Sequence, residues 1–355
     1  MFSQLFATTW FLVILFVVGL TILVKGADWL VDGASDLAKR LGVSDLMIGL
    51  TVVAFGTSMP EFIVNMASVS ANATDLAITN VLGSNSINTL VILGCSALVF
   101  PIVAKQKTAR FDLPLNILAG VLVFLWVWMS WAGETSKGIS RLEGSFLLLV
   151  FVGFLFYNLK SAKSEVDEKV APRMTLWKSM LLVLVGLLSL VLGGELVVRS
   201  ATRIAQQAGI SESVIGLTIV ALGTSLPELA TSVMAAFKHN SDIAIGNVVG
   251  SNIFNVFFIL GTSALIRPLP AYEGVETDTL LVALSAALVW LLLVCSKKRT
   301  INRWGGALLL LVYAAYLFFR LVGIGCIDEK QQCASPTVDS SLFATNQQKP
   351  NKGCA

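Results

Sequence analysis

Charged side chains are scarce in this sequence. They make up only 13% of its 355 residues, whereas soluble globular proteins carry about 25%. Hydrophobic residues account for 55% of the chain, above the roughly 45–50% that is usual in soluble domains. This balance excludes an ordinary soluble domain and indicates a membrane protein.

Histidine is almost absent as well. The single one, His239, lies in the polar stretch KHNSD. A histidine-rich metal centre needs more than one, and a serine–histidine pair needs the histidine beside a nucleophile. We therefore expect no enzyme activity and no cofactor. Lysines and arginines flank apolar runs and do not gather into one patch, so we expect no nucleic-acid partner. No obligatory protein partner is indicated either.

Long apolar runs are what the chain has in abundance. Runs of about 20 residues, the length of a helix that crosses a bilayer, recur throughout the sequence. They are continuous rather than alternating, which favours helices over strands. The start, MFSQLFATTW, lacks a basic region, so we expect the first run to be retained and not cleaved as a signal peptide. The fold class we predict is an all-α polytopic membrane protein with ten transmembrane helices, near residues 10–31, 43–69, 76–99, 111–131, 143–159, 178–199, 211–237, 243–265, 276–296 and 303–322.

The distribution of lysine and arginine predicts the orientation of these spans. Alternate loops hold most of the basic residues, including the stretch KSAKSEVDEK after the fifth span. Basic loops stay in the cytoplasm. We expect a multi-pass protein of the cell (inner) membrane, surrounded by the lipid bilayer, with the 160–175 loop cytoplasmic and both termini outside.

The sequence contains an internal repeat. Glu61 and Glu228 are 167 residues apart (228 − 61), and at that offset SDLMIGLTVVAFGTSMPEF aligns without a gap with SESVIGLTIVALGTSLPEL. Further on, DLAITNVLGSNSINTLVILGCSAL aligns with DIAIGNVVGSNIFNVFFILGTSAL. The predicted organisation is a first five-helix repeat at residues 1–160, a cytoplasmic charged linker at 161–174, a second five-helix repeat at 175–325, and a polar tail at 326–355 that we expect to be disordered.

Five spans per repeat have a consequence for function. Because five is odd, the second copy enters the membrane from the opposite side, so the two repeats are inverted. Inverted repeats are typical of secondary transporters, whose substrate site lies near the midplane between the repeats. Alternating access uses this symmetry, because the states open to either side become near-equivalent arrangements of one scaffold.

The stretches GTSMPEF and GTSLPEL place an ionisable residue inside an apolar run. One explanation is structural: Ser58 and Ser225 each precede a glutamate by three residues, the spacing of a capping box, and the glycine before them suits a helix end. However, a charge at the bilayer centre costs about 2.5–3.5 kcal/mol and usually marks an ion path. We therefore predict that Glu61 and Glu228 bind ions at two broken helices.

Neutral oxygen atoms surround both acids in the sequence. The next span of each repeat carries GSNSIN or GSNIFN, in which a serine and an asparagine four residues apart share one helix face. Helix packing by small residues is the alternative for these motifs. Oxygen-only ligands suit hard cations such as Na⁺ and Ca²⁺. The predicted neutral ligands are Thr57, Ser58, Thr224, Ser225, the freed carbonyls around Ala54 and Ala221, and Ser84, Asn88, Ser251 and Asn255.

These paired motifs resemble the two α-repeats of the cation/Ca²⁺ exchanger superfamily, particularly the prokaryotic Na⁺/Ca²⁺ exchangers. The resemblance covers both halves and leaves out only the linker and tail. It implies ten helices and antiport of Ca²⁺ against Na⁺, with these two ions as substrates. It also implies a binding site formed by Glu61, Ser58, Thr57, Ala54, Ser84 and Asn88 from one repeat, and by Glu228, Ser225, Thr224, Ala221, Ser251 and Asn255 from the other.

One position departs from the resemblance. Several relatives have aspartate where this chain has Asn255, and K⁺-dependent exchangers rely on that acid, so K⁺ co-transport is not expected. Asparagine at 88 and at 255 leaves a site charge of −2 from the two glutamates, which balances one Ca²⁺ or two Na⁺. A Ca²⁺/H⁺ antiporter on the same scaffold stays open as an alternative, because a buried carboxylate can also exchange protons.

Two further acids are related by the repeat. Asp28 and Glu195 lie near the ends of the first and sixth spans. We expect them to have interfacial or helix-packing roles and not to bind the transported ions. A membrane enzyme or scaffold is the remaining reading, and it would leave the symmetric acids unexplained.

Overall fold

A computed structural model of the chain describes residues 9–128, 137–161, 171–210, 212–215, 218–219, 221–272 and 274–334. Nearly all of this part is helical, with π-helical segments labelled η. The first half contains α2 (Thr9–Leu41), α3 (Asp45–Ile48), η1 (Gly49–Val53), α4 (Ala54–Thr57), α5 (Met59–Ser70), α6 (Thr74–Ser86), η2 (Ile87–Ile92), α7 (Leu93–Val99), β1 (Ile102–Val103), η3 (Thr108–Asp112), α8 (Leu113–Trp128), β2 (Gly138–Ile139) and α9 (Arg141–Ser161). The second half contains α10 (Leu176–Gln207), α11 (Glu212–Ile215), α12 (Ala221–Gly223), α13 (Leu226–Phe237), α14 (Ser241–Ile253), η5 (Phe254–Leu260), α15 (Gly261–Ile266), β3 (Leu269–Pro270), α16 (Val275–Cys295), β4 (Thr300–Ile301) and α17 (Arg303–Ala334).

Several helices have the length and composition of membrane spans. Among the described residues seven pass this test, and eight do so if the bent pair Asp45–Thr57 and Met59–Ser70 is counted as one span. The expected span at 211–237 includes residues outside the described set, and the expected span at 303–322 falls in α17. The chain divides into one compact unit up to Tyr313 and a second from Ala314. Helix α17 continues to Ala334, into the expected tail; residues 335–355, like most of the predicted linker, lie outside the described residues.

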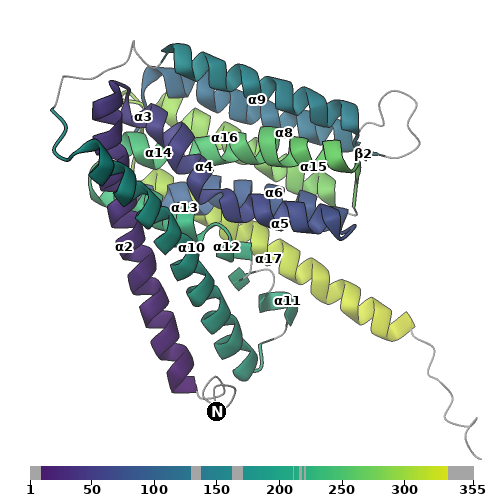
Figure 1. The fold of residues 1–355 in the computed structure, drawn as a ribbon. Helices are drawn as coiled ribbons and strands as arrows, with labels where there is room; N and C mark the ends of the chain where they lie inside the picture. Colours follow the sequence, from purple (N-terminus) through teal and green to yellow (C-terminus); the bar gives the residue numbers. More distant parts are fainter. Residues whose placement is uncertain are drawn as a thin grey trace, which may run out of the picture. The chain divides into compact units, whose positions relative to one another are not determined.

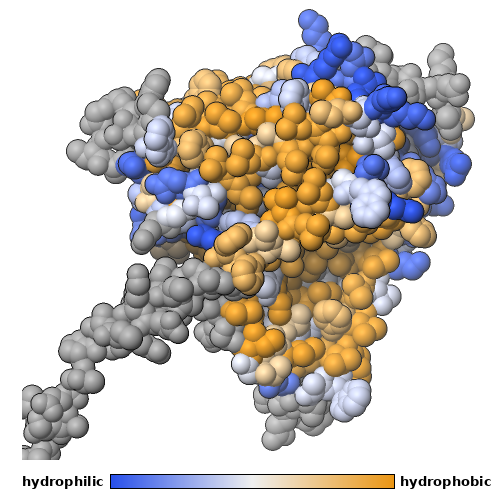
Figure 2. All heavy atoms as spheres, turned by 180° about the vertical axis from the view of Figure 1, so that it is seen from behind, coloured by the Kyte–Doolittle hydropathy of each residue, from blue (hydrophilic) through white to orange (hydrophobic). Residues whose placement is uncertain are grey.

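The surface agrees with a lipid environment. Figure 2 shows a face on which apolar residues cover most of the area and hydrophilic residues gather towards its margins. Large apolar side chains such as Trp10 and Leu149 are exposed to 81% and 71%. Exposed apolar surface of this extent is unusual in soluble proteins. The chain is therefore a membrane protein with several apolar spans.

The two spans that carry the serine–asparagine motifs are the most enclosed. In Thr74–Val99 and Ser241–Ile266, 78% and 94% of the most apolar window is buried, against at most 44% in the other spans. Each of these two spans contains a π-helical segment, η2 or η5, immediately after the motif's first residues. Such segments are often found at functional sites.

Helices α2 and α10 form a closely packed antiparallel pair (Figure 1). Glycines allow this approach: a Cβ atom on Gly26 would lie 2.9 Å from the carbonyl oxygen of Gly186, and one on Gly193 would lie 2.8 Å from that of Gly19. Because Gly19 meets Gly193 while Gly26 meets Gly186, the two helices run in opposite directions. This course is compatible with inverted repeats.

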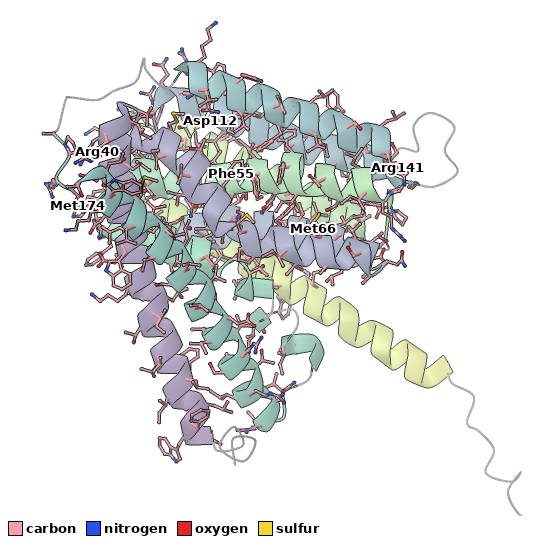
Figure 3. All side chains as sticks on the ribbon, in the orientation of Figure 1. Arg40, Phe55, Met66, Asp112, Arg141 and Met174 are labelled. Atoms are coloured by element: carbon pink, nitrogen blue, oxygen red, sulfur yellow. The ribbon has the colours of Figure 1, made fainter. Side chains whose placement is uncertain are left out.

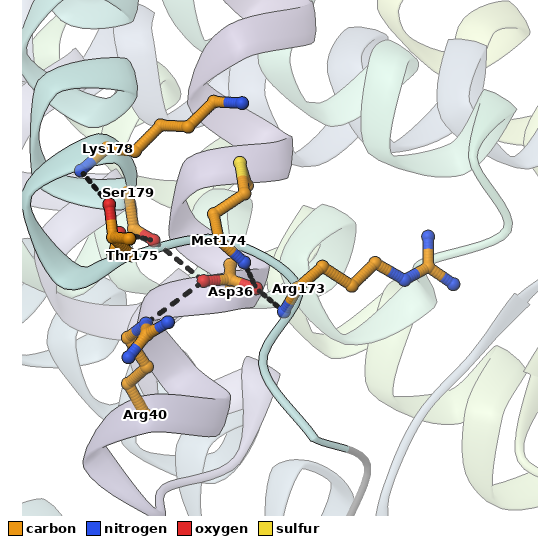
Figure 4. A network of polar contacts seen from close by, with 7 residues as sticks. All are labelled: Asp36, Arg40, Arg173, Met174, Thr175, Lys178 and Ser179. Atoms are coloured by element: carbon orange, nitrogen blue, oxygen red, sulfur yellow. Dashed lines mark hydrogen bonds and ion pairs between the residues drawn. The ribbon is translucent and has the colours of Figure 1, made fainter.

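Asp36 fastens one end of this helix pair (Figure 4). Its carboxylate accepts hydrogen bonds from the main-chain N–H groups of Arg173 and Met174 and from the Ser179 hydroxyl at 2.7 Å. Arg40 completes the surroundings with an ion pair at 3.4 Å. Only 3% of Asp36 is exposed, and several donors to one carboxylate compensate for that burial. The end of α2 is thereby held to the start of α10.

Short antiparallel ribbons also connect the two halves. Strand β1 pairs with β4 through Ile102 and Ile301, and β2 pairs with β3 through Gly138 and Pro270. Each ribbon takes one strand from each repeat. The repeats are therefore joined by main-chain hydrogen bonds as well as by helix packing.

Candidate functional site

Glu61 and Glu228 follow directly after an interruption of a helix in each repeat. The first interruption separates Asp45–Thr57 from α5, and the two segments meet at an angle of 45°. The second separates α12 from α13. Each glutamate is the third residue of the helix that follows, and neither side chain has any exposed surface. The predicted helix breaks at the two motifs are confirmed.

The serines of the two motifs cross from one repeat to the other. The Ser58 hydroxyl donates a hydrogen bond to Oε1 of Glu228 at 2.7 Å, and the Ser225 hydroxyl donates to Oε1 of Glu61 at 3.2 Å. Neither serine caps its own helix, so the capping-box explanation is wrong. A capping residue usually has an extended backbone, whereas Ser58 has φ −85° and ψ 8°. The crossing bonds bring the two acids into one cluster.

The glycines of the motifs have a role in packing. We considered Gly56 and Gly223 as left-handed helix ends, but neither has a positive φ. A Cβ atom on Gly56 would lie 2.5 Å from Leu187, and one on Gly223 would lie 2.8 Å from Val198. Both neighbours belong to α10. These glycines therefore allow the broken helices to approach α10 closely.

Four buried oxygen atoms in this cluster lack a hydrogen-bond donor. Within the described part of the chain, Oε2 of Glu61 and Glu228 and Oδ1 of Asn88 and Asn255 have no partner. All four residues are fully buried. Leaving a buried acceptor unsatisfied costs about 1–3 kcal/mol, and more when the group is charged. The same two atoms are left without a donor in each repeat, which indicates a shared requirement and not a local accident of packing.

Two asparagines orient these free oxygens. The Asn88 amide donates to Oδ1 of Asn252 at 3.1 Å, and the Asn255 amide donates to Oδ1 of Asn85 at 3.0 Å. With the nitrogen of each amide held by the opposite repeat, its oxygen is the atom left over. Sequence reasoning missed Asn85 and Asn252, although both stand at the third position of the repeated GSN motif.

A second missed pair supports the backbone at the breaks. The amides of Asn80 and Asn247 donate to the main-chain carbonyls of Glu61 and Glu228, each at 3.3 Å. Oδ1 of Asn247 also accepts a hydrogen bond from Thr57 at 3.1 Å. Backbone groups freed by a broken helix must be satisfied within the protein in a membrane. Both asparagines occupy the same repeat position, which was the available signal.

The remaining predicted ligands lie around the acids with different contacts. The hydroxyls of Thr57 and Ser251 interact with Glu228, and that of Thr224 interacts with Glu61. The Ala54 carbonyl accepts from Ser251 at 3.5 Å and from Thr57 at 3.4 Å. Ser84 is buried on α6. Of Ala221 the structure describes the backbone, at the start of α12.

The cluster has the chemistry of a hard-cation site. Its polar atoms are carboxylate, hydroxyl, amide and carbonyl oxygens, the ligands that Na⁺ and Ca²⁺ prefer. No group of three or more histidine, cysteine, aspartate or glutamate side chains is placed to hold a metal among the described residues. The site therefore combines two formal charges with many neutral oxygens.

Known proteins share this arrangement of sequence and fold. The family described as sodium/calcium exchanger protein matches residues 11–160 and 178–322. The putative antiporter CaxA of Alkalimonas amylolytica is 36% identical over 312 residues, which cover 85% of this chain and 96% of that protein. The sodium/calcium exchanger MaX1 of Methanosarcina acetivorans is 32% identical over 343 residues, 86% of this chain and 97% of that protein. A solved structure of the sodium-calcium exchanger NCX_Mj superposes with a TM-score of 0.75 at 31% identity, covering 87% and 99% of the two chains.

Replacing Asn252 by alanine removes the acceptor that holds the Asn88 amide. The amide can then turn its nitrogen towards the acids, so we expect cation affinity to fall by about tenfold, as for other groups that orient metal ligands. The Ca²⁺-dependent rise in the melting temperature of the purified protein measures this affinity. Asn158→Ala is the matched control: it removes a buried asparagine bonded to Lys107 and should leave the Ca²⁺ dependence unchanged. A normal Ca²⁺ dependence in Asn252→Ala contradicts the orienting role.

Proposed function

This chain belongs to the sodium/calcium exchanger family, and we propose that it exchanges Ca²⁺ for Na⁺ across the cell (inner) membrane by alternating access. One observation carries the proposal. Glu61 and Glu228, one from each repeat, are fully buried, and each keeps one oxygen without a hydrogen-bond partner among the described residues. An uncompensated pair of buried carboxylates is strongly unfavourable, so a bound cation is the natural partner.

The proposed ion site combines both repeats. The two glutamates supply its charge, and the hydroxyls, amides and broken-helix carbonyls supply neutral oxygens. The crossing hydrogen bonds of Ser58 and Ser225 support this grouping, as do the free oxygens of Asn88 and Asn255. The full set that we propose as ion ligands is Glu61, Glu228, Thr57, Ser58, Ser84, Asn88, Thr224, Ser225, Ser251 and Asn255, with the carbonyls of Ala54 and Ala221.

The charge of the site explains exchange. Two glutamates carry a formal charge of −2, which one Ca²⁺ or two Na⁺ neutralise. Neither ion can occupy the acids while the other does, so binding of one displaces the other. An ion gradient drives transport only through such a difference in binding between competing states. Competition for the two carboxylates is therefore the proposed basis of coupling.

Neutral oxygens favour Na⁺ over H⁺ as the counter-ion. A proton requires a carboxylate and little else, whereas Na⁺ requires several oxygens to replace its water shell. The hydroxyls of Thr57 and Ser251 beside Glu228 have no evident purpose in a proton site. The second candidate is Ca²⁺/H⁺ antiport, which the unpartnered Oε2 atoms favour because each of them could accept a proton.

The proposed architecture has ten spans in two inverted repeats, at 1–160 and 175–325, joined by a cytoplasmic linker. The antiparallel course of α2 and α10 supports the inversion. The basic loops support the orientation, with the linker inside and both termini outside.

Glu61→Gln and Glu228→Gln should each abolish Ca²⁺ transport without preventing membrane insertion. Each change removes half of the formal charge and keeps the shape of the side chain. Removing a buried charged partner costs about 2–5 kcal/mol, at least about thirtyfold in ion affinity. Ca²⁺ flux into proteoliposomes is the measurement, with Glu195→Gln, whose side chain is 55% exposed, as a control that keeps normal flux. Near-normal flux in either site variant contradicts the assignment.

An imposed Na⁺ gradient should drive Ca²⁺ uptake into proteoliposomes at fixed pH, even when the proton gradient is collapsed. The reason is that Na⁺ and Ca²⁺ compete for the same two carboxylates. The Na⁺ gradient and the pH gradient are varied independently while Ca²⁺ is followed. Ca²⁺ flux that follows the pH gradient and ignores Na⁺ would establish the Ca²⁺/H⁺ alternative.

Labelling of single cysteines tests the orientation. An impermeant thiol reagent applied from outside should reach Cys333 and should miss a cysteine placed at Ser164. The expectation follows from the basic residues around the linker and the odd number of spans in each repeat. The opposite labelling pattern would reverse the proposed topology.

A further inference from the structure

Lys238 ties the turn between α13 and α14 to helix α2. Its ammonium group lies 2.6 Å from Oδ1 of Asp28 and 2.7 Å from Oδ1 of Asp32. It also donates a hydrogen bond to the main-chain carbonyl of Asp28 at 2.9 Å. The expected helix-packing role of Asp28 thus takes the form of an ion pair between elements. Because α13 carries Glu228 and packs along α2, the contact joins a helix of the ion site to its neighbour.

The same turn is also tied to the start of the first broken helix. The Asn240 amide donates to Oδ2 of Asp45 at 2.6 Å, and the Ser35 hydroxyl of α2 donates to that same oxygen at 2.9 Å. A cavity of about 450 Å³ beside these contacts is lined by residues from the turn, from α2 and from the segment before α10, including Met174. Figure 3 shows Met174 and Arg40 together at this end of the helices and Arg141 at the opposite end. We call the end marked by Met174 the linker end.

The repeat predicts an equivalent contact at the opposite end, and the chain lacks the residues for it. At the offset of 167 residues, Lys238 corresponds to Ala71 and Asp32 corresponds to Arg199. Arg199 instead pairs with Glu195 of its own helix, and these side chains are 77% and 55% exposed. Helices α10 and α5, the counterparts of α2 and α13, make little contact with each other in the described residues. The contact therefore belongs to one end only.

We propose that Lys238, Asp28 and Asp32 form an ionic latch that keeps the ion path closed at the linker end and must separate before ions pass there. This inference rests on the alternating-access antiport proposed above. Because the opposite end has no counterpart, the latch makes the two states unequal in free energy. The ion-free protein then favours the state that is closed at the linker end.

The surroundings of the latch suit a contact that breaks in every cycle. The side chains of Lys238, Asp28 and Asp32 are 24%, 32% and 55% exposed. Ion pairs in contact with water are weak and are screened by salt. The latch therefore biases the equilibrium between states without locking it. The Asp36 network is different, because its carboxylate is almost fully buried and holds α2 to α10 throughout.

Spin labels on Leu41 and Phe237 can report the opening without any transport. These side chains are 58% and 70% exposed, at the ends of α2 and α13. In the ion-free protein we expect one dominant label-to-label distance, and in Lys238→Met a longer distance whose population rises by about five- to tenfold, the effect of losing partly exposed ion pairs. Arg199→Met, the repeat-related control, should keep the wild-type distribution. An unchanged distribution in Lys238→Met overturns the latch.

Exchange of isotopic Ca²⁺ for Ca²⁺ provides a second readout that does not depend on the counter-ion. A larger share of protein open at the linker end lowers the half-saturating Ca²⁺ concentration at that end and raises it at the other. We expect these opposite shifts in Lys238→Met, and their reversal in the charge-swapped variant Lys238→Glu with Asp32→Lys. Equal shifts at both ends would indicate a merely structural defect and overturn the latch. Wild-type protein that exchanges no Ca²⁺ would refute the proposed function, and the distance measurement would still decide the latch.

Discussion

Two carboxylates without access to water are the constraint on which the structure depends. Glu61 and Glu228 are fully buried, in a protein whose spans offer no other charge to pair with them at the helix breaks. Each is satisfied at one oxygen by a serine from the opposite repeat, and each keeps the other oxygen free. Breaking the helices before the acids supplies further oxygens nearby, and the asparagines Asn80 and Asn247 hold the carbonyls of the acids themselves. The cluster remains incomplete without a cation.

The repeat gives the site its symmetry, and the surroundings remove part of it. Serines, glutamates and asparagines correspond pairwise across the two halves, so the site presents similar oxygens to both sides. Outside the site the correspondence ends: Lys238 has a carboxylate partner on α2, whereas Ala71 at the related position cannot form one. In a transporter with inverted repeats, such differences determine which of the two states is more stable.

Much of the site could be predicted because its residue types conflict with their environment. Glutamate and proline inside an apolar run, repeated after 167 residues, are costly unless they serve a purpose, and this cost pointed to Glu61 and Glu228 before any coordinates. The capping-box explanation failed for a reason that spacing cannot reveal. Whether Ser58 donates to its own helix or to a distant glutamate depends on which group lies nearer in space. Asn85 and Asn252 were missed for the same reason, since an orienting side chain is recognised by its partner and not by its type.

The sequence by itself determined a helical membrane protein, a two-fold internal repeat and two acids at broken helices, because hydropathy and residue spacing act locally along the chain. Only the tertiary structure decided which atoms meet across the repeats. The hydrogen bonds between Ser58 and Glu228 and between Asn88 and Asn252 join residues 170 and 164 positions apart, and no local pattern encodes such a pairing. It also decided that the amide oxygens of Asn88 and Asn255 stay free and that Lys238 reaches Asp28. These features arise from packing between helices, which sets distances that spacing along one chain leaves undetermined.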